Sequence, residues 1–189
     1  MAASEATWMV RVTRAHTAEL TRGDLAAARS LLDAAFEELP PDERFGDADW
    51  EHALGGQHVL VHEGEVLIGH GSLVQRRLVH DGRALRAGYV EAVATAAGHR
   101  RRGVGTAVMA ALEELAPAYD LLALGATDDG VLLYESRGWQ RWRGRLSALT
   151  PSGVVRTPDD EGWLFVMPAA AIVDLDGELT CDWRDGDLW

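Results

Sequence analysis

The chain has 189 residues, 47% of them hydrophobic, which is enough to fill one α/β core but not two separate domains. Its formal net charge of −12 argues against a nucleic-acid partner, because phosphate binding needs many cationic contacts. No apolar run reaches the roughly 18 residues of a membrane span, the N-terminus lacks a secretory pattern, and a single cysteine, Cys181, fits a reducing cytoplasm.

The first half of the chain reads as a strand, two helices and a long antiparallel hairpin. Apolar residues repeat with a period of about 3.6 before Pro40-Pro41, which predicts a helix that ends at the prolines. Asp81-Gly82 between two strand-like runs indicates a tight hairpin turn. The expected elements are a strand at 9–13, a helix at 24–39, a short helix at 49–54, and strands at 58–62, 66–79 and 84–95.

In the second half, a turn rich in arginine and glycine opens another helix. A short buried strand, a helix closed by Gly138 and a final strand pair follow. We expect these at 121–124, 128–137, 139–149 and 163–168, with a loop at 150–162 and an irregular acidic tail at 169–189. This order predicts one α/β (α+β) domain over residues 1–189, with a mixed central sheet flanked by helices.

The turn itself, Arg100-Arg101-Arg102-Gly103-Val104-Gly105, has the chemistry of a phosphate cradle. Glycines allow close backbone approach, the first helical turn offers unpaired N–H groups, and the arginines add permanent positive charge. The run matches neither the P-loop nor the dinucleotide fingerprint. A glycine-rich turn with solvated arginines is the plainer alternative.

This R-x-x-G-x-G loop resembles the acyl-CoA pyrophosphate loop of the GCN5-related N-acetyltransferases (GNAT). The resemblance implies acetyl-CoA as co-substrate, bound by Val93, Ala94 and Thr95 of the preceding strand and by Arg100 to Gly105. It also implies that the backbone N–H of Val93 stabilises the oxyanion. Tyr134, in the pattern Tyr-x-x-x-Gly-aromatic, resembles the family's general acid, although a core tyrosine would fit the same pattern.

Glu91 is a charged residue within the otherwise apolar run that ends the central strand. Burying a carboxylate without a partner is costly, so the position needs an explanation. Glu91 could act as a base through water or bind a substrate ammonium group; alternatively, it lies on the solvated face of a half-buried strand.

Several blocks from residue 49 to the end, among them Asp49-Trp50-Glu51-His52 and Cys181-Asp182-Trp183-Arg184, resemble the mycobacterial aminoglycoside 2′-N-acetyltransferases. Acidic groups at 42–49, 159–161 and 182–187 would suit a polycationic sugar. The family has an acid where this chain has Arg44, and Glu43 could substitute. The resemblance implies a substrate site that includes the 169–189 arm, formed by Asp49, Glu91, Ala92, Gly125, Asp159, Asp160, Asp187 and the terminal carboxylate of Trp189.

We therefore expect a cytoplasmic enzyme that transfers acetyl from acetyl-CoA to the 2′-amine of an aminoglycoside by direct attack. Tyr134 would be the acid, and Glu91 and the Trp189 carboxylate would accept protons. The alternatives are transfer to another polyamine or a protein N-terminus, and a module that binds acetyl-CoA or cationic drugs without turnover. No metal, nucleic-acid or membrane partner is expected: His58 and His62, four apart on a strand, could not share a metal. A homodimer is expected by resemblance alone.

Overall fold

The structure, a computed structural model, describes residues 10–41 and 43–189, so Met9 of the first expected strand and Asp42 of the first acidic group lie outside the described residues. The elements are β1 Val10–His16, α1 Arg22–Phe36, α2 Asp47–Ala53, β2 Gln57–Glu63, β3 Val66–His80, β4 Arg83–Thr95, α3 Val104–Glu113, β5 Leu121–Gly125, α4 Asp128–Ser136, β6 Gln140–Arg141, β7 Leu146–Thr150, β8 Gly153–Arg156, β9 Leu164–Pro168 and β10 Leu179–Cys181.

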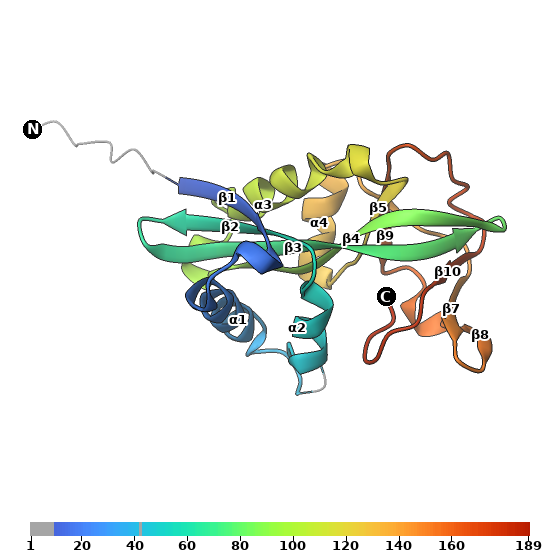
Figure 1. The fold of residues 1–189 in the computed structure, drawn as a ribbon, viewed down its shortest axis with the longest axis horizontal. Helices are drawn as coiled ribbons and strands as arrows, with labels where there is room; N and C mark the ends of the chain where they lie inside the picture. Colours follow the sequence, from blue (N-terminus) through green and yellow to red (C-terminus); the bar gives the residue numbers. More distant parts are fainter. Residues whose placement is uncertain (1–9, 42) are drawn as a thin grey trace, which may run out of the picture.

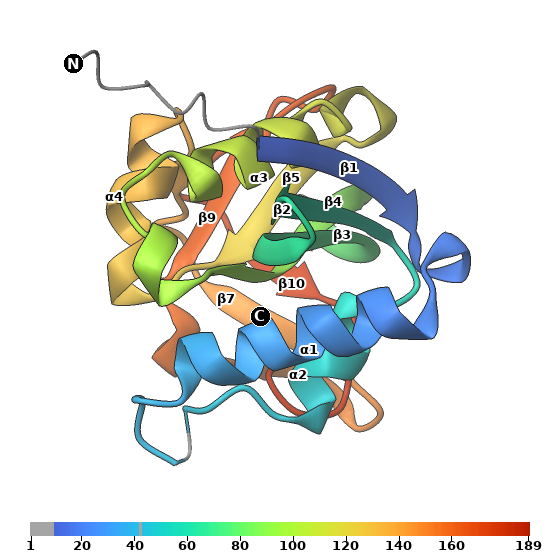
Figure 2. The ribbon, with the colours of Figure 1, turned by 90° about the vertical axis from the view of Figure 1, so that its left-hand side faces the viewer.

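The described strands form one mixed sheet in the order β6-β9-β5-β4-β3-β10-β7-β8, and β2 pairs with both β1 and β3. The β4–β5 and β10–β7 pairs are parallel, whereas the other pairs are antiparallel. Helices α1 and α2 lie on one side of this sheet, and α3 and α4 lie on the other (Figures 1 and 2). The predicted mixed sheet flanked by helices is confirmed.

The long hairpin of β3 and β4 is the centre of the sheet. Its turn consists of Asp81 and Gly82, which have φ values of 49° and 72°, as the Asp-Gly signal predicts for a two-residue turn. Near the other end, the register moves from Ser72↔Glu91 to His70↔Ala94. One residue of β3 therefore faces two of β4, Ala92 and Val93, which is a β-bulge.

On the other side of β4 from this bulge, the pairing with β5 stops early. Pairing between β4 and β5 ends at Tyr89↔Ala123, although β4 continues to Thr95 and β5 to Gly125. Ala92 has a φ of 52°, in the left-handed region that residues with a Cβ rarely adopt. The two parallel strands consequently end without pairing, and a gap is left where parallel strands would ordinarily continue side by side.

Helix α4 is fixed to α3 by one half-buried carboxylate. Glu113 accepts hydrogen bonds from Trp139 Nε1 and Arg137 Nε, each at 2.8 Å. Tyr134 packs between the rings of Trp139 and Phe165, with centroids 6.2 and 6.3 Å away. These contacts hold the tyrosine of α4 at the gap between β4 and β5.

Three expectations about the second half of the chain were wrong. The expected strand 139–149 is divided into β6 and β7, because the N–H groups of Arg143 and Gly144 donate to the Leu175 carbonyl and turn the chain away from β9. The expected loop 150–162 contains β8, which pairs with β7 after a turn at Pro151 and Ser152. The tail contributes β10, which inserts between β3 and β7. Helix α1 also ends at Phe36, three residues before Leu39.

Candidate active site

A cavity of about 950 Å³ lies at the gap between β4 and β5. Its walls come from the end of β4, the arginine loop, the start of α3, α4 and the end of α1. The residues expected to bind the coenzyme that line it are Val93, Ala94, Thr95, Arg100, Arg101, Gly103 and Gly105. Arg102 and Val104 fall outside the lining: Arg102 donates to the Gly98 carbonyl at 3.4 Å, and Val104 is buried in the core.

The arginine loop is shaped for this cavity by two left-handed residues. Arg101 has a φ of 60° and Gly103 a φ of 84°, and α3 begins at the next residue. Arg100 donates to the Ala35 carbonyl of α1 at 3.2 Å, which ties the loop to the opposite wall. The N-terminus of α3, with its unpaired N–H groups and positive dipole end, thus meets the arginines at one mouth, which fits a pyrophosphate.

Tyr134 lines this cavity and is only 7% exposed. Burial raises the pKa of Tyr134 to about 12, because the phenolate would lose its hydration in the core. The hydroxyl is therefore protonated at neutral pH and can donate a proton or a hydrogen bond. A general acid needs that state at the start of a reaction.

A second, smaller cavity of about 220 Å³ adjoins the first. The two share Tyr134 and Val93, so a group placed in either cavity can reach this junction. Arg44 lines the second cavity, and Glu43 lines both cavities. The residues expected to bind substrate that line it are Asp49, Glu91, Ala92, Gly125 and Asp187.

The last residues of the chain fold back to the middle of the molecule (Figures 1 and 2). Arg76 of β3, which is 4% exposed, donates to the Asp182 carboxylate at 2.8 Å and to the Leu188 carbonyl at 2.7 Å. Trp189 Nε1 donates to Thr157 Oγ1 at 2.9 Å. The Trp189 carbonyl lies so near Gly125 that a Cβ there would be 3.4 Å from it. The arm therefore ends at the rim of the second cavity.

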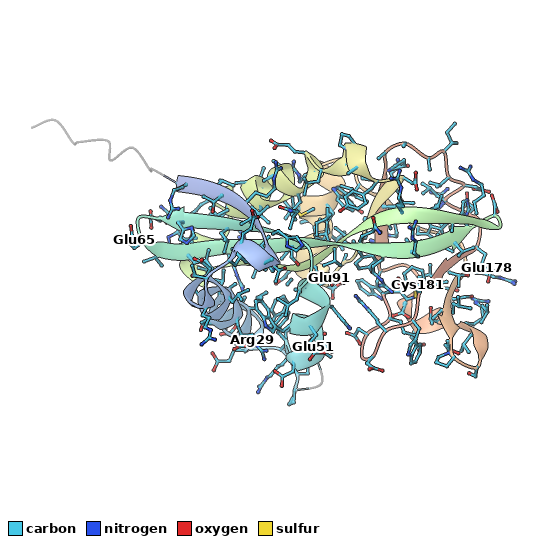
Figure 3. The ribbon with its side chains drawn as sticks, in the orientation of Figure 1. Arg29, Glu51, Glu65, Glu91, Glu178 and Cys181 are labelled. Carbon is cyan, nitrogen blue, oxygen red and sulfur yellow. The ribbon has the colours of Figure 1, made fainter. Side chains whose placement is uncertain are left out.

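Glu91 has a partner that the sequence did not suggest. Arg184 of the arm donates to the Glu91 carboxylate at 2.5 Å, and both side chains are about 15% exposed. The Arg184 guanidinium also lies over the Tyr89 ring, 5.5 Å from its centroid. Glu91 lies near the centre of the molecule, far from Glu65 at the β2–β3 turn (Figure 3). A substrate ammonium group would have to share this carboxylate with Arg184 or displace it.

The other expected acids gather beside the arm. Burial raises the pKa of Asp160, and the nearby Asp187 and Asp159 carboxylates raise it further. Asp49 lines the cavity, but its carboxylate also accepts from the Gly46 N–H at 2.7 Å and caps α2. Asp182 does not join this group, because Arg76 binds it. Arg76 and Arg184 are the residues of the site that the sequence analysis missed.

Two histidines without an assigned role lie in contact behind the bulge. His58 Nδ1 is 3.0 Å from His70 Nε2, and His70 Nδ1 is 2.8 Å from the Ala92 carbonyl oxygen. Among residues 10–41 and 43–189, no three His, Cys, Asp or Glu side chains are grouped to hold a metal ion. No helix in that part of the chain is long and apolar enough to cross a membrane.

Known proteins share this fold. The crystal structure of a GNAT family acetyltransferase from Brucella melitensis in complex with acetyl-CoA matches with a TM-score of 0.60 at 13% identity, covering 91% of this chain and 95% of that one. A GCN5-related N-acetyltransferase from Kribbella flavida matches 72% of this chain with a TM-score of 0.56 at 16% identity, and the match spans 34% of that longer protein. These likenesses concern the fold.

The sequence comparisons identify the family. Residues 16–142 match the model of the acetyltransferase (GNAT) domain. An aminoglycoside 2′-N-acetyltransferase of Mycolicibacterium fortuitum is 48% identical over 179 residues, which cover 92% of this chain and 89% of that protein. The chain therefore belongs to the GNAT acetyltransferases and, among them, to the family of the aminoglycoside 2′-N-acetyltransferases.

Proposed function

We propose that this protein is a single-domain, cytoplasmic enzyme that transfers the acetyl group of acetyl-CoA to the 2′-amine of an aminoglycoside. The observation that carries the proposal is the pair of adjoining cavities that meet at Tyr134 and Val93. One is bounded by arginines and a helix N-terminus, which suit an anionic coenzyme. The other is bounded by carboxylates, which suit a sugar with several ammonium groups.

Each step of the transfer can be assigned to a residue that lines these cavities or ends the arm. The neutral 2′-amine nitrogen attacks the thioester carbonyl carbon, so that a C–N bond forms and the C–S bond breaks. Val93 N–H stabilises the negative charge that develops on the carbonyl oxygen. Glu91, through water, and the Trp189 carboxylate accept the proton that leaves the amine. Tyr134 protonates the departing thiolate. No covalent enzyme intermediate is required.

Substrate binding falls to Asp49 and Asp187, which line the second cavity, and to Asp160 beside Asp187, as ammonium ligands. Each charge-assisted hydrogen bond is worth about 1.5–3 kcal/mol, so several are needed to select a polycation. Ala92 and Gly125 form part of the cavity wall, and Asp159 contributes from beside Asp160. Arg102 and Val104 contribute to the coenzyme loop through its backbone shape rather than its cavity lining. A homodimer is the proposed assembly.

A thiol-release assay with acetyl-CoA tests the proposal. Tobramycin carries a 2′-amine and is the test acceptor; amikacin carries a 2′-hydroxyl and is the matched control. We expect thiol release with tobramycin alone, and a monoacetylated product whose 2′ position is identified by NMR. Release with amikacin at a similar rate, or acetylation elsewhere on the sugar, would contradict the 2′ assignment. Release with spermidine and not with tobramycin would favour another polyamine as acceptor.

A further inference from the structure

The bulge on β4 contains the peptide unit that the proposed mechanism uses. A trans peptide is planar, so the C=O of Ala92 and the N–H of Val93 lie in one plane and point in opposite directions. A group that holds the Ala92 carbonyl on one side therefore sets the direction of the Val93 N–H on the other. Val93 lines both cavities, whereas the Ala92 carbonyl is bound by a buried side chain.

That side chain is His70, which begins a chain of hydrogen bonds with only one consistent set of protons. A carbonyl oxygen only accepts, so His70 Nδ1 must donate to Ala92 at 2.8 Å. The Nε2 of a neutral ring is then an acceptor, and His58 Nδ1 must donate to it at 3.0 Å. His58 Nε2 in turn accepts from Thr17 Oγ1 at 2.8 Å.

In this relay of hydrogen bonds through Thr17, His58 and His70, both histidine rings stay neutral. His58 and His70 are 0% exposed, and burial lowers the pKa of each to about 4. In this arrangement a second proton on His70 Nε2 would face the proton on His58 Nδ1. Trp50 of α2 covers His70 from the helix side, with ring centroids 6.4 Å apart. The two rings are thus shielded from water, whereas Thr17 is half-buried.

The Ala92–Val93 peptide, which His70 binds, follows a residue with an unfavourable backbone conformation. Ala92 has a φ of 52°, a conformation that residues with a Cβ keep only where the surroundings impose it. Ser72 Oγ adds a longer bond of 3.4 Å to the neighbouring Glu91 carbonyl. Of these two contacts, the one from His70 to the Ala92 carbonyl is the shorter.

We infer that His70, backed by His58 and Thr17, is a positioning residue for acetyl transfer. It holds the Ala92–Val93 peptide so that the Val93 N–H faces the junction of the two cavities, where the thioester oxygen must lie. The inference rests on the proposed function, because it gives the relay a role in the step that this function assigns to Val93. A histidine pair that only fills the core would stabilise the fold without affecting turnover selectively.

Kinetics of His70 variants separate these two roles. His70→Leu removes the donor, and we expect kcat to fall about 10- to 100-fold, which approaches the effect of deleting an oxyanion donor. The KM for tobramycin and the Kd of acetyl-CoA should change by no more than about twofold, because the cavities keep their walls. His70→Asn places an amide N–H near the position of Nδ1, so it should restore kcat to within about threefold of the wild type.

His80 provides the matched control. It is also buried, at 5% exposure, and its Nδ1 lies 2.9 Å from the Glu178 carbonyl oxygen at the far end of the hairpin. His80→Leu should lower the free energy of unfolding as His70→Leu does, yet leave kcat unchanged. An equal loss of kcat in both variants, or none in a folded His70→Leu protein, would overturn the inference.

A measurement on the wild type needs no variant to fold. Long-range ¹H–¹⁵N correlation spectra of labelled protein report which ring nitrogen carries the proton. Both His58 and His70 should be protonated at Nδ1, and protonation of either at Nε2 alone would refute the relay. If the wild type releases no thiol with tobramycin, the proposed function fails. The Val93 amide then decides the inference: its proton resonance should shift on acetyl-CoA addition in the wild type and not in His70→Leu, and equal shifts would overturn it.

Discussion

The buried histidine pair predicts a loss of stability in mild acid. Both rings have a folded-state pKa of about 4, lowered by burial, whereas an unfolded chain would titrate near 6.5. Between these values the unfolded chain binds more protons than the folded protein. The free energy of unfolding therefore rises with pH across this window. The contribution of the two rings is fully present above about pH 6.5 and is lost as the solution is acidified.

The size of the effect follows from the two pKa values. A ring whose pKa moves from about 6.5 to about 4 loses roughly 1.8 kcal/mol of stabilisation between pH 7 and pH 5. The loss for His58 and His70 together is about 3–4 kcal/mol, since neither ring is appreciably protonated in the folded state at pH 5. That is a large share of the roughly 5–15 kcal/mol by which a domain is stable.

Urea unfolding at pH 5, 6 and 7, followed by tryptophan fluorescence, measures this loss. The control is the double variant His58→Leu/His70→Leu, in which the slope of stability against pH should be much smaller, whatever its absolute stability. His62, whose pKa burial also lowers, remains in both proteins and cancels in the comparison. A wild type that loses less than about 1 kcal/mol from pH 7 to pH 5 would refute the reasoning.

Three further changes address the site. Tyr134→Phe should lower kcat about 100-fold and leave the Kd of acetyl-CoA unchanged, as measured by single-turnover kinetics and calorimetry; unchanged turnover would reject the acid role. Removal of Trp189 should raise the KM for tobramycin about tenfold or more, because a charge-assisted contact and the Thr157 bond are lost, with acetyl-CoA affinity as the internal control. Gly103→Ala should cost about 1–2 kcal/mol in urea unfolding, because φ is 84° there, and Gly98→Ala, where a Cβ meets nothing within 4 Å, serves as its comparison.

The strong local signals in the sequence predicted most of the fold. Asp81-Gly82 formed the predicted hairpin turn, whereas the helix expected to run up to Pro40-Pro41 ended earlier, at Phe36. The failures were non-local: β10 has three residues and becomes a strand because β3 and β7 offer it partners on both sides. Its sequence contains no repeat long enough to indicate a strand.

The candidate site divides in the same way. The cradle residues follow one another along the chain, and four of the six, Arg100, Arg101, Gly103 and Gly105, line one cavity. The pair of Glu91 and Arg184, by contrast, joins residues that are 93 positions apart. His58 and His70 are 12 apart and meet across neighbouring strands, and no spacing rule for metals or catalysis selects them. Such contacts depend on strand register, which the sequence pattern left open.

The hydrogen bonds from Arg76 to the arm have a consequence for how the protein is produced. Arg76 of β3 binds Asp182 and the Leu188 carbonyl, and the half-buried Trp189 ends against Gly125. Affinity tags or fluorescent fusions added after Trp189 would either pass through the second cavity or displace the arm. Recombinant versions should therefore carry their tags at the N-terminus. For the same reason, the rate of carboxypeptidase digestion with and without an aminoglycoside measures whether binding protects the arm.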